Sequence, residues 1–316
     1  MRVLITGGAG YIGSTATSIL LDKGYEVTVL DDCSTGHADS VDPRAQFIEG
    51  SLLDTQVIRA ALVGCSAVLH FAAKALVAES VAKPELYHQT NVLGSKNLLA
   101  EMAAAGISKL VLSSTAATYG EPKSSPITED AEPAPVNPYG ATKLEVDRIV
   151  TEAAKSGLAA ISLRYFNVAG ALKSKNGWLV ERHDPETHLI PNILGATKNS
   201  PVKIFGSDWP TPDGTCVRDY IHVVDLVSAH ILALEKLTPG VHRIINLGSG
   251  TGHSVAEVVA AASAVVGYEI PAEFAPRRAG DPAILVADIS RANTELGWKP
   301  TYSLQQMVSD TWESKK

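Results

Sequence analysis

Short runs of β-branched and other apolar residues recur along the chain, separated by segments with helical periodicity. The runs cover residues 3–6, 27–30, 47–48, 67–70, 110–112, 160–163 and 244–247. Between them, residues 12–22, 55–63 and 85–105 place apolar side chains three and four positions apart, as amphipathic helices do. This alternation predicts an α/β fold with a doubly wound, Rossmann-type parallel sheet, in which ligands bind at the carboxyl ends of the strands.

The pattern loosens after residue 166. Residues 171–187 are polar, and helical runs return near Leu189 and again from Val223. We therefore expect a sheet domain at 1–166, with a return segment near 215–250, and a smaller α/β substrate domain at 167–316. Five prolines between 122 and 138 exclude a regular helix or strand there. An interdomain linker is possible, but we favour a structured loop.

Composition narrows the class of protein. The 316 residues are 45% apolar and 19% charged, enough to bury a sizeable core. A net charge of -7 disfavours a nucleic-acid partner. The most apolar early stretch, residues 60–73, is shorter than the roughly 20 residues of a membrane span, and no signal-peptide pattern opens the chain. We expect a cytoplasmic protein, whose three cysteines are ordinary thiols.

A glycine fingerprint follows the first predicted strand. Gly8, Gly10 and Gly13 match G-x-G-x-x-G, and Gly7 extends the pattern. Glycines here permit a tight turn and a close approach of the backbone to a diphosphate, which the helix N-terminus then binds. Asp31 lies 18 residues beyond Gly13, where a carboxylate accepts bonds from a ribose diol and repels a 2′-phosphate. The pattern predicts NAD rather than NADP, with the role of neighbouring Asp32 left open.

A second motif carries candidate chemistry. Tyr139 and Lys143 stand four residues apart on one face of a helix predicted to begin near Pro138. Ser113-Ser114-Thr115 follows a strand, at the sheet edge where substrates bind. A tyrosine acting as a base near pH 7 needs its pKa lowered by about 3 units, or about 4 kcal/mol. We expect Lys143 and the oxidised nicotinamide to supply this, although the motif alone is more often an ordinary surface pair.

The chain resembles the extended short-chain dehydrogenase/reductase superfamily, and within it the UDP-glucose 4-epimerase family. The broader likeness rests on T-G-G-A-G-Y-I-G at 6–13, S-S-T-A-A-T-Y-G at 113–120, N-P-Y-G-A-T-K at 137–143 and R-Y-F-N at 164–167. The closer one rests on V-R-D-Y-I-H-V at 217–223 and F-A-P-R-R-A-G-D at 274–281. The similarity extends from Arg2 to Trp312.

The resemblance implies a mechanism. Tyr139 takes the proton of the sugar 4-hydroxyl while hydride leaves C4 for NAD, Thr115 shares the hydrogen bond, and Lys143 holds the phenol and the nicotinamide ribose. The 4-keto sugar then turns and receives the hydride on its other face. Related dehydratases carry Asp-Glu after the catalytic threonine, where this chain has Ala116 and Ala117. Neither alanine can move a proton, so the resemblance favours epimerisation over dehydration.

The family also implies a set of ligand contacts. The cofactor residues are Gly7, Gly10, Tyr11, Ile12, Gly13, Asp31, Asp32, Ser51, Leu52, Phe71, Ala72, Ala73, Asn91, Ser113, Tyr139, Lys143 and Tyr165. The UDP-sugar residues are Thr115, Tyr139, Asn167, His188, Leu189, Phe205, Arg218, Arg278 and Asp281. Arg218 and Arg278 are the expected clamp on the diphosphate. Arg218 could instead pair with Asp219, and Arg277 could face solvent.

This sequence departs from the family pattern at four positions. Ser51 replaces an aspartate that caps the adenine, and Ala75 replaces a frequent lysine beside the cofactor phosphates, with Lys74 expected to point elsewhere. Thr115 replaces a frequent serine and keeps the hydroxyl. Leu285 occupies a wall position where bulk excludes N-acetylated sugars. The main expected pair is UDP-glucose and UDP-galactose, with the N-acetyl pair left open.

Two other functions are compatible with parts of this pattern. A 4-epimerase of UDP-pentoses would carry the same catalytic residues, and a non-catalytic NAD-binding regulator would not need them. The family implies a homodimer through helices at 85–105 and 139–154, although burial against the sheet explains their apolar faces equally well. Glu181, His183 and His188 match no familiar metal-site spacing, so no metal is expected.

Overall fold

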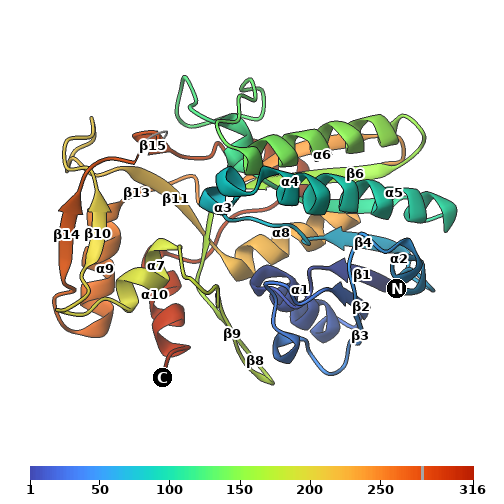
Figure 1. Cartoon of the computed structure of the whole chain (residues 1–316), viewed down its shortest axis with the longest axis horizontal. Helices are drawn as coiled ribbons and strands as arrows, with labels where there is room; N and C mark the ends of the chain where they lie inside the picture. The colour runs from blue at the N-terminus through green and yellow to red at the C-terminus, as the bar shows by residue number, and fades with distance from the viewer. Residues whose placement is uncertain (279–280) are drawn as a thin grey trace.

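The protein is described here by a computed structural model covering residues 1–278 and 281–316. A seven-stranded parallel sheet forms its larger part (Figure 1). Its order is β3 (Gln46–Glu49), β2 (Glu26–Asp31), β1 (Arg2–Thr6), β4 (Ala67–His70), β5 (Lys109–Thr115), β6 (Ala159–Tyr165) and β12 (His242–Leu247). Chain order reverses between β1 and β4, which is the switch point where such sheets bind ligands. The predicted doubly wound sheet is confirmed.

Helices cover both faces of this sheet because successive residues of each buried strand point in opposite directions. Val3 and Ile5 pack toward α1 (Tyr11–Asp22) and α8 (Val223–Glu235), whereas Leu4 packs toward the other layer. That layer consists of α2 (Thr55–Ala61), α5 (Gly94–Ala104) and α6 (Pro138–Ala154). Figure 1 shows α3 (Val77–Ala82) and α4 (Pro84–Tyr87) beside α6, with a π-helical turn η2 (His88–Leu93) joining α4 to α5.

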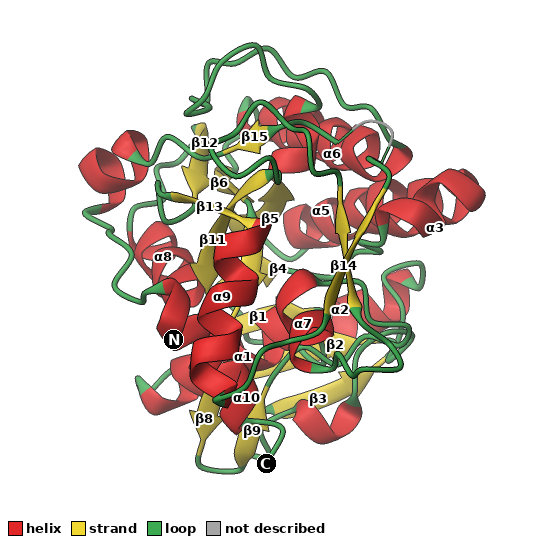
Figure 2. Cartoon of the chain, turned by 90° about the vertical axis from the view of Figure 1, so that its left-hand side faces the viewer, coloured by secondary structure: helices red, strands yellow, loops and turns green. Residues whose placement is uncertain are grey.

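The second lobe contains short strands and helices (Figure 2). In one sheet, β11 (Val217–His222) pairs with β7 (Asn167–Ala169), β13 (Gly252–Ser254) and β15 (Ile284–Leu285). Two smaller pairs are β10 (Val202–Phe205) with β14 (Ala272–Ala275), and β8 (Leu172–Ser174) with β9 (Gly177–Leu179). The helices are α7 (Leu189–Leu194), α9 (Val255–Val266) and α10 (Leu304–Glu313).

None of the helices at 1–278 and 281–316 is long and apolar enough to cross a membrane.

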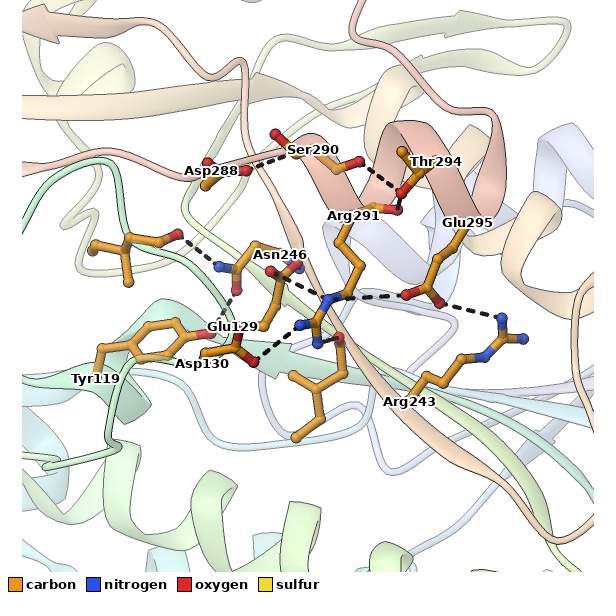
Figure 3. A network of polar contacts seen from close by, with 12 residues as sticks. Tyr119, Glu129, Asp130, Arg243, Asn246, Asp288, Ser290, Arg291, Thr294 and Glu295 are labelled. Atoms are coloured by element: carbon orange, nitrogen blue, oxygen red, sulfur yellow. Dashed lines mark hydrogen bonds and ion pairs between the residues drawn. The ribbon is translucent and has the colours of Figure 1, made fainter.

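The proline-rich segment is an ordered loop between the 3₁₀ turn η3 (Ala116–Tyr119) and α6. Ile127 exchanges backbone hydrogen bonds with Val286 and Asp288, at 2.8 and 2.9 Å. The Asn246 amide nitrogen donates to the Ile127 carbonyl at 2.9 Å, and its oxygen accepts from the Tyr119 hydroxyl at 2.7 Å. Figure 3 shows the contact between Tyr119 and Asn246 beside Arg291, which approaches Glu129, Asp130 and, on the π turn η4 (Ala292–Leu296), Glu295. The loop is thereby fixed at the end of β12.

Candidate active site

The glycine turn builds an anion site at the start of α1. Gly10 is the N-cap of this helix, which has neither a side-chain cap nor an acidic residue in its first turn. A Cβ atom on Gly13 would lie 2.0 Å from the Gly7 carbonyl oxygen, so only glycine permits this close packing. The amide groups of the first turn therefore remain available, and together with the helix dipole they fit the diphosphate of a dinucleotide.

Asp31 ends β2 beside this turn and is 9% exposed. Its carboxylate accepts hydrogen bonds from the Ala9 and Cys33 amides at 2.9 and 2.8 Å. Burial raises the pKa of Asp31, and these two bonds partly oppose that shift. Two carboxylate oxygens offer about four acceptor sites, so capacity remains for the hydroxyls of a ribose. Asp32 is exposed and accepts from the Ser34 amide at 3.0 Å, which leaves Asp31 the better ribose ligand.

Helix α6, which carries Tyr139 and Lys143, begins with a side-chain N-cap. The Asn137 side chain accepts a hydrogen bond from the Gly140 amide at 2.8 Å, and Pro138 occupies the first helical position. A Cβ atom on Gly140 would lie 2.4 Å from the Ala117 carbonyl oxygen. Glycine thus lets α6 approach the turn after β5, so that Tyr139 and Thr115 line the same cavity.

Lys143 lies one turn further along α6 and is 5% exposed. Its ammonium donates to the Ser113 carbonyl at 2.8 Å. Burial lowers the pKa of Lys143 to about 8, against the opposing charge of Asp147. Burial raises the pKa of Tyr139, and the Thr115 side chain opposes the shift. The expectation that Lys143 lowers the Tyr139 pKa is therefore not met in the protein alone, because the ammonium is directed at the Ser113 carbonyl.

Two cavities meet beside Tyr139 and Lys143. The larger, of about 1140 Å³, and the smaller, of about 860 Å³, share a wall that includes Asn167, His188, Arg278 and Asp281. Predicted residues on the larger cavity are Gly7, Gly10, Tyr11, Ile12, Gly13, Asp31, Asp32, Ser51, Leu52, Phe71, Ala72, Ala73, Thr115, Tyr139, Lys143 and Tyr165. Leu189, Phe205 and Arg218 line the smaller one. Together they have room for a dinucleotide and a nucleotide sugar.

The smaller cavity contains the two arginines expected at a diphosphate. Arg218 donates to the Pro282 carbonyl at 2.8 Å and lies 3.6 Å from the Asp281 carboxylate. The Arg278 guanidinium stacks over the Phe205 ring, 3.8 Å from its centroid. Asp219 is buried and accepts from Ser249 and from backbone amides rather than from Arg218. The reading of Arg218 as the partner of Asp219 is therefore wrong. Residues 279–280 lie outside the described residues.

Three residues that the sequence analysis named, Asn91, Ser113 and Leu285, do not line either cavity. The Asn91 side chain is 2% exposed and bonds the Lys74 backbone and the Thr142 hydroxyl. Ser113 is 1% exposed, and its carbonyl holds Lys143. Leu285 packs in an apolar cluster with Ala116 and Phe166 instead of lining either cavity. These side chains can position the residues in front of them.

Sequence reasoning missed several segments of the larger cavity. Among them, one runs from Ser34 to Ser40 and includes the short turn η1 (Ala38–Ser40), and another is 180–187. The segments contact each other, because Arg182 pairs with Asp39 at 2.9 Å and its carbonyl lies 3.2 Å from His37 Nε2. The two lobes therefore meet across the cofactor side of the cavity. The only signal in the sequence was the density of charged residues in 181–188.

The same loop gathers side chains that could hold a metal. Ligand atoms of Glu181, His183 and His188 lie within 4.8 Å of one another. Each imidazole Nδ1 already faces a carboxylate of the loop, His183 that of Glu181 and His188 that of Glu186, the latter at 2.7 Å. These hydrogen bonds within the loop already occupy one nitrogen of each imidazole.

We expect His188 to titrate above the ordinary histidine pKa of about 6.5. Burial lowers the pKa of this imidazole, but the Glu186 hydrogen bond and the charges of Glu181 and Glu186 outweigh burial and raise it. Its pairing then stabilises the fold fully below about pH 6.5, and that stabilisation is lost as pH rises through the folded-state pKa. An NMR titration of the imidazole tests this. Glu186→Gln should lower the midpoint, and an unchanged midpoint would remove Glu186 as the cause.

The comparisons with known proteins agree with this geometry. Residues 3–248 match the model of the NAD dependent epimerase/dehydratase family, and the chain belongs to that family. A UDP-glucose 4-epimerase of Corynebacterium glutamicum is 52% identical, with 99% of this chain and 95% of the relative covered. The corresponding Streptomyces lividans protein is 49% identical at the same coverages.

Solved structures give the same picture. The UDP-glucose 4-epimerase from Stenotrophomonas maltophila, with bound NAD and formylated UDP-arabinopyranose, superposes with a TM-score of 0.94 at 39% identity, covering 100% and 98% of the two chains. The Brucella ovis UDP-glucose 4-epimerase in complex with NAD gives 0.93 at 40% identity, covering 99% and 97%.

Proposed function

We propose that this chain is an NAD-dependent UDP-glucose 4-epimerase that interconverts UDP-glucose and UDP-galactose. The observation that carries the proposal is the placement of Thr115, Tyr139 and Lys143 on the wall of one cavity that joins a dinucleotide site to an arginine-bearing site. Relatives that are 43–52% identical over nearly the whole chain carry this activity in their names.

The chain's own residues account for the proton transfer. Tyr139 exchanges a proton with the sugar 4-hydroxyl, and Thr115, which lines the same cavity, orients that hydroxyl. A bound NAD would supply the acceptor and the donor of hydride at C4, and the positive charge of its oxidised ring would oppose the effect of burial on Tyr139. Lys143, with a pKa near 8, remains mostly protonated at neutral pH, and its ammonium holds the Ser113 carbonyl.

The turn after Thr115 favours epimerisation over elimination. Ala116 and Ala117 form the start of η3, directly against the N-terminus of α6. Neither side chain can donate or accept a proton, so this turn supplies no second acid or base for the loss of water from C5–C6. The site residues support simple oxidation and return at C4.

The two arginines support a nucleoside diphosphate as the handle of the substrate. Arg218 and Arg278 converge on the smaller cavity, next to Phe205 and Asp281. A firm hold on the diphosphate leaves the sugar end free to turn at the junction of the cavities, where Asn167 and His188 lie. The 4-keto intermediate must turn there without escaping.

Incubation of the purified protein with UDP-galactose, without added cofactor, tests the function. We expect UDP-glucose to accumulate in the NMR spectrum until the two sugars reach equilibrium, using NAD retained by the protein. A panel with UDP-pentoses and N-acetylated UDP-sugars separates this substrate pair from the alternatives. No product from any of these sugars, even with NAD added, would refute the proposal.

We also propose a homodimer formed by the helices around 85–105 and by α6. Large apolar side chains remain exposed on and beside these elements, namely Val81 and Leu93, at 65% and 45%. A dimer would cover them. A monomer in light scattering at micromolar concentration would contradict this assembly. We assign the protein to the cytoplasm, because Cys33, Cys65 and Cys216 are free thiols, as proteins of a reducing compartment carry.

A further inference from the structure

Lys74 occupies a fixed position at the carboxyl end of β4. Its backbone amide donates to Asn91 Oδ1 at 2.8 Å, and its carbonyl accepts from Asn91 Nδ2 at 3.0 Å. The Asn91 amide also donates to Thr142 on the catalytic helix, at 3.1 Å. The buried asparagine therefore holds the backbone of Lys74 in a defined orientation, so the direction of its side chain follows from the fold.

The Lys74 side chain spans the mouth of the dinucleotide site. Its ammonium donates to Ser34 Oγ at 3.0 Å. Ser34 follows β2 and Lys74 follows β4, and β1 lies between these two strands in the sheet. The contact must therefore pass across the end of β1, where the glycine turn begins. Both residues line the larger cavity together with Gly10 and Tyr11. The expectation that Lys74 points away from the cofactor is wrong.

The ammonium has no carboxylate partner in the described chain. No ion pair involving Lys74 occurs among residues 1–278 and 281–316 at distances up to 4.0 Å. The nearby Asp31 carboxylate is bonded to backbone amides, as is Asp32. A lysine ammonium carries three donors, and the serine takes one. A half-buried cation with spare donors thus faces a cavity that starts at an uncapped helix N-terminus.

We propose that Lys74 is a cofactor ligand, which binds the NAD diphosphate from the side opposite the α1 N-terminus and slows cofactor release. Ser34 holds the lysine over the cavity, and the backbone amides of α1 supply the other half of the anion site. This contact replaces the cation that Ala75, an exposed residue without a polar side chain, cannot provide. The inference rests on the proposed NAD-dependent function.

The rate of NAD loss tests this assignment. The wild type, Lys74→Met, Lys74→Arg and the control Lys155→Met are loaded with NAD and desalted, and the NAD remaining on each protein is measured after denaturation at timed intervals. Lys155 is exposed at the end of α6 and pairs with Glu152. We expect Lys74→Met to release NAD about tenfold faster, with a weaker dependence on salt, whereas Lys74→Arg and Lys155→Met stay within about twofold of the wild type.

Equal release rates for the wild type and Lys74→Met would overturn the assignment while leaving the proposed function intact. Equal acceleration by Lys155→Met would also overturn it, because any lost surface cation would then have the same effect. Failure of the wild type to bind NAD would instead refute the proposed function. The experiment therefore separates the two claims.

Discussion

Replacement of Tyr139 with phenylalanine is expected to reduce turnover of UDP-galactose by about a thousandfold, within the range that positioned acid–base groups contribute. The substitution removes only the hydroxyl of a side chain that lines the larger cavity. The ring stays in place, because its edge-on contact with Tyr87, at 6.5 Å between centroids, involves no oxygen. Neither Thr115 nor Lys143 can replace the phenol, since one ordinarily keeps its proton and the other is directed at the Ser113 carbonyl. Turnover is measured by NMR under saturating UDP-galactose.

Tyr87→Phe is the matched control. The Tyr87 hydroxyl donates to the Leu76 carbonyl at 2.7 Å, and its ring is buried outside both cavities. Its loss should cost about 1 kcal/mol of stability while turnover changes little. Tyr139→Phe should also retain NAD and its unfolding temperature. Near-normal turnover in Tyr139→Phe would remove the phenol from the mechanism, whatever the structure around it.

The sheet could be predicted from the sequence because its strands are buried on both faces and read as continuous apolar runs. Each predicted run lies within an observed strand, from β1 to β12. The second lobe could not be predicted in the same way. Its strands are two to six residues long, as in β15 and β11, and are specified by their partners rather than by their own periodicity.

The residues of the candidate site also fall into two groups, those that could be predicted from the sequence and those that could not. Motif residues such as Gly13, Asp31 and Tyr139 line the cavity because each does so through its own local structure: a turn, a strand end or a helix start. Side chains that reach the site over a distance were not visible in the sequence. Lys74 depends on the amide of Asn91, seventeen residues away, and Arg182 depends on Asp39 in the other lobe.

The pKa shifts of Tyr139 and Lys143 could not be predicted from their spacing in the sequence. Tyr139 and Lys143 share a helix face, which suggested a direct effect of the ammonium on the phenol. The backbone carbonyl of Ser113 takes the ammonium instead. Burial then dominates both groups, raising the pKa of Tyr139 and lowering that of Lys143. Burial is a property of the packed molecule, so no sequence motif reports it.

The second large effect is expected on stability, when a buried ion pair between β6 and α6 is broken. The Arg164 guanidinium on β6 donates to Asp147 Oδ2 on α6 at 2.9 and 3.1 Å, and both side chains are 2% exposed. Ser114, next to Thr115, donates to the same oxygen at 3.1 Å. Asp147 Oδ1 has no hydrogen-bond partner in the described chain. Among the described residues, Arg164 is the one ion-pair partner of this carboxylate.

Arg164→Met is expected to lower the free energy of unfolding by about 3–5 kcal/mol, because it leaves the Asp147 charge buried without its ion-pair partner. The unfolding temperature should fall by roughly 10 °C. The guanidinium also lies 4.9 Å from the Tyr119 ring centroid, a contact that methionine keeps in part. Thermal and urea unfolding measure the change, with Lys155→Met as the control, since exposed pairs contribute at most about 1 kcal/mol.

The double variant Arg164→Met/Asp147→Leu decides whether the uncompensated charge is the cause. Removing the carboxylate should restore most of the lost stability, since apolar replacement of a buried pair is often neutral. If the double variant were no more stable than Arg164→Met, the loss would lie in packing around Tyr119 instead. Recovery of stability without recovery of turnover would show that the pair, through Ser114 and α6, also fixes Thr115 relative to Tyr139.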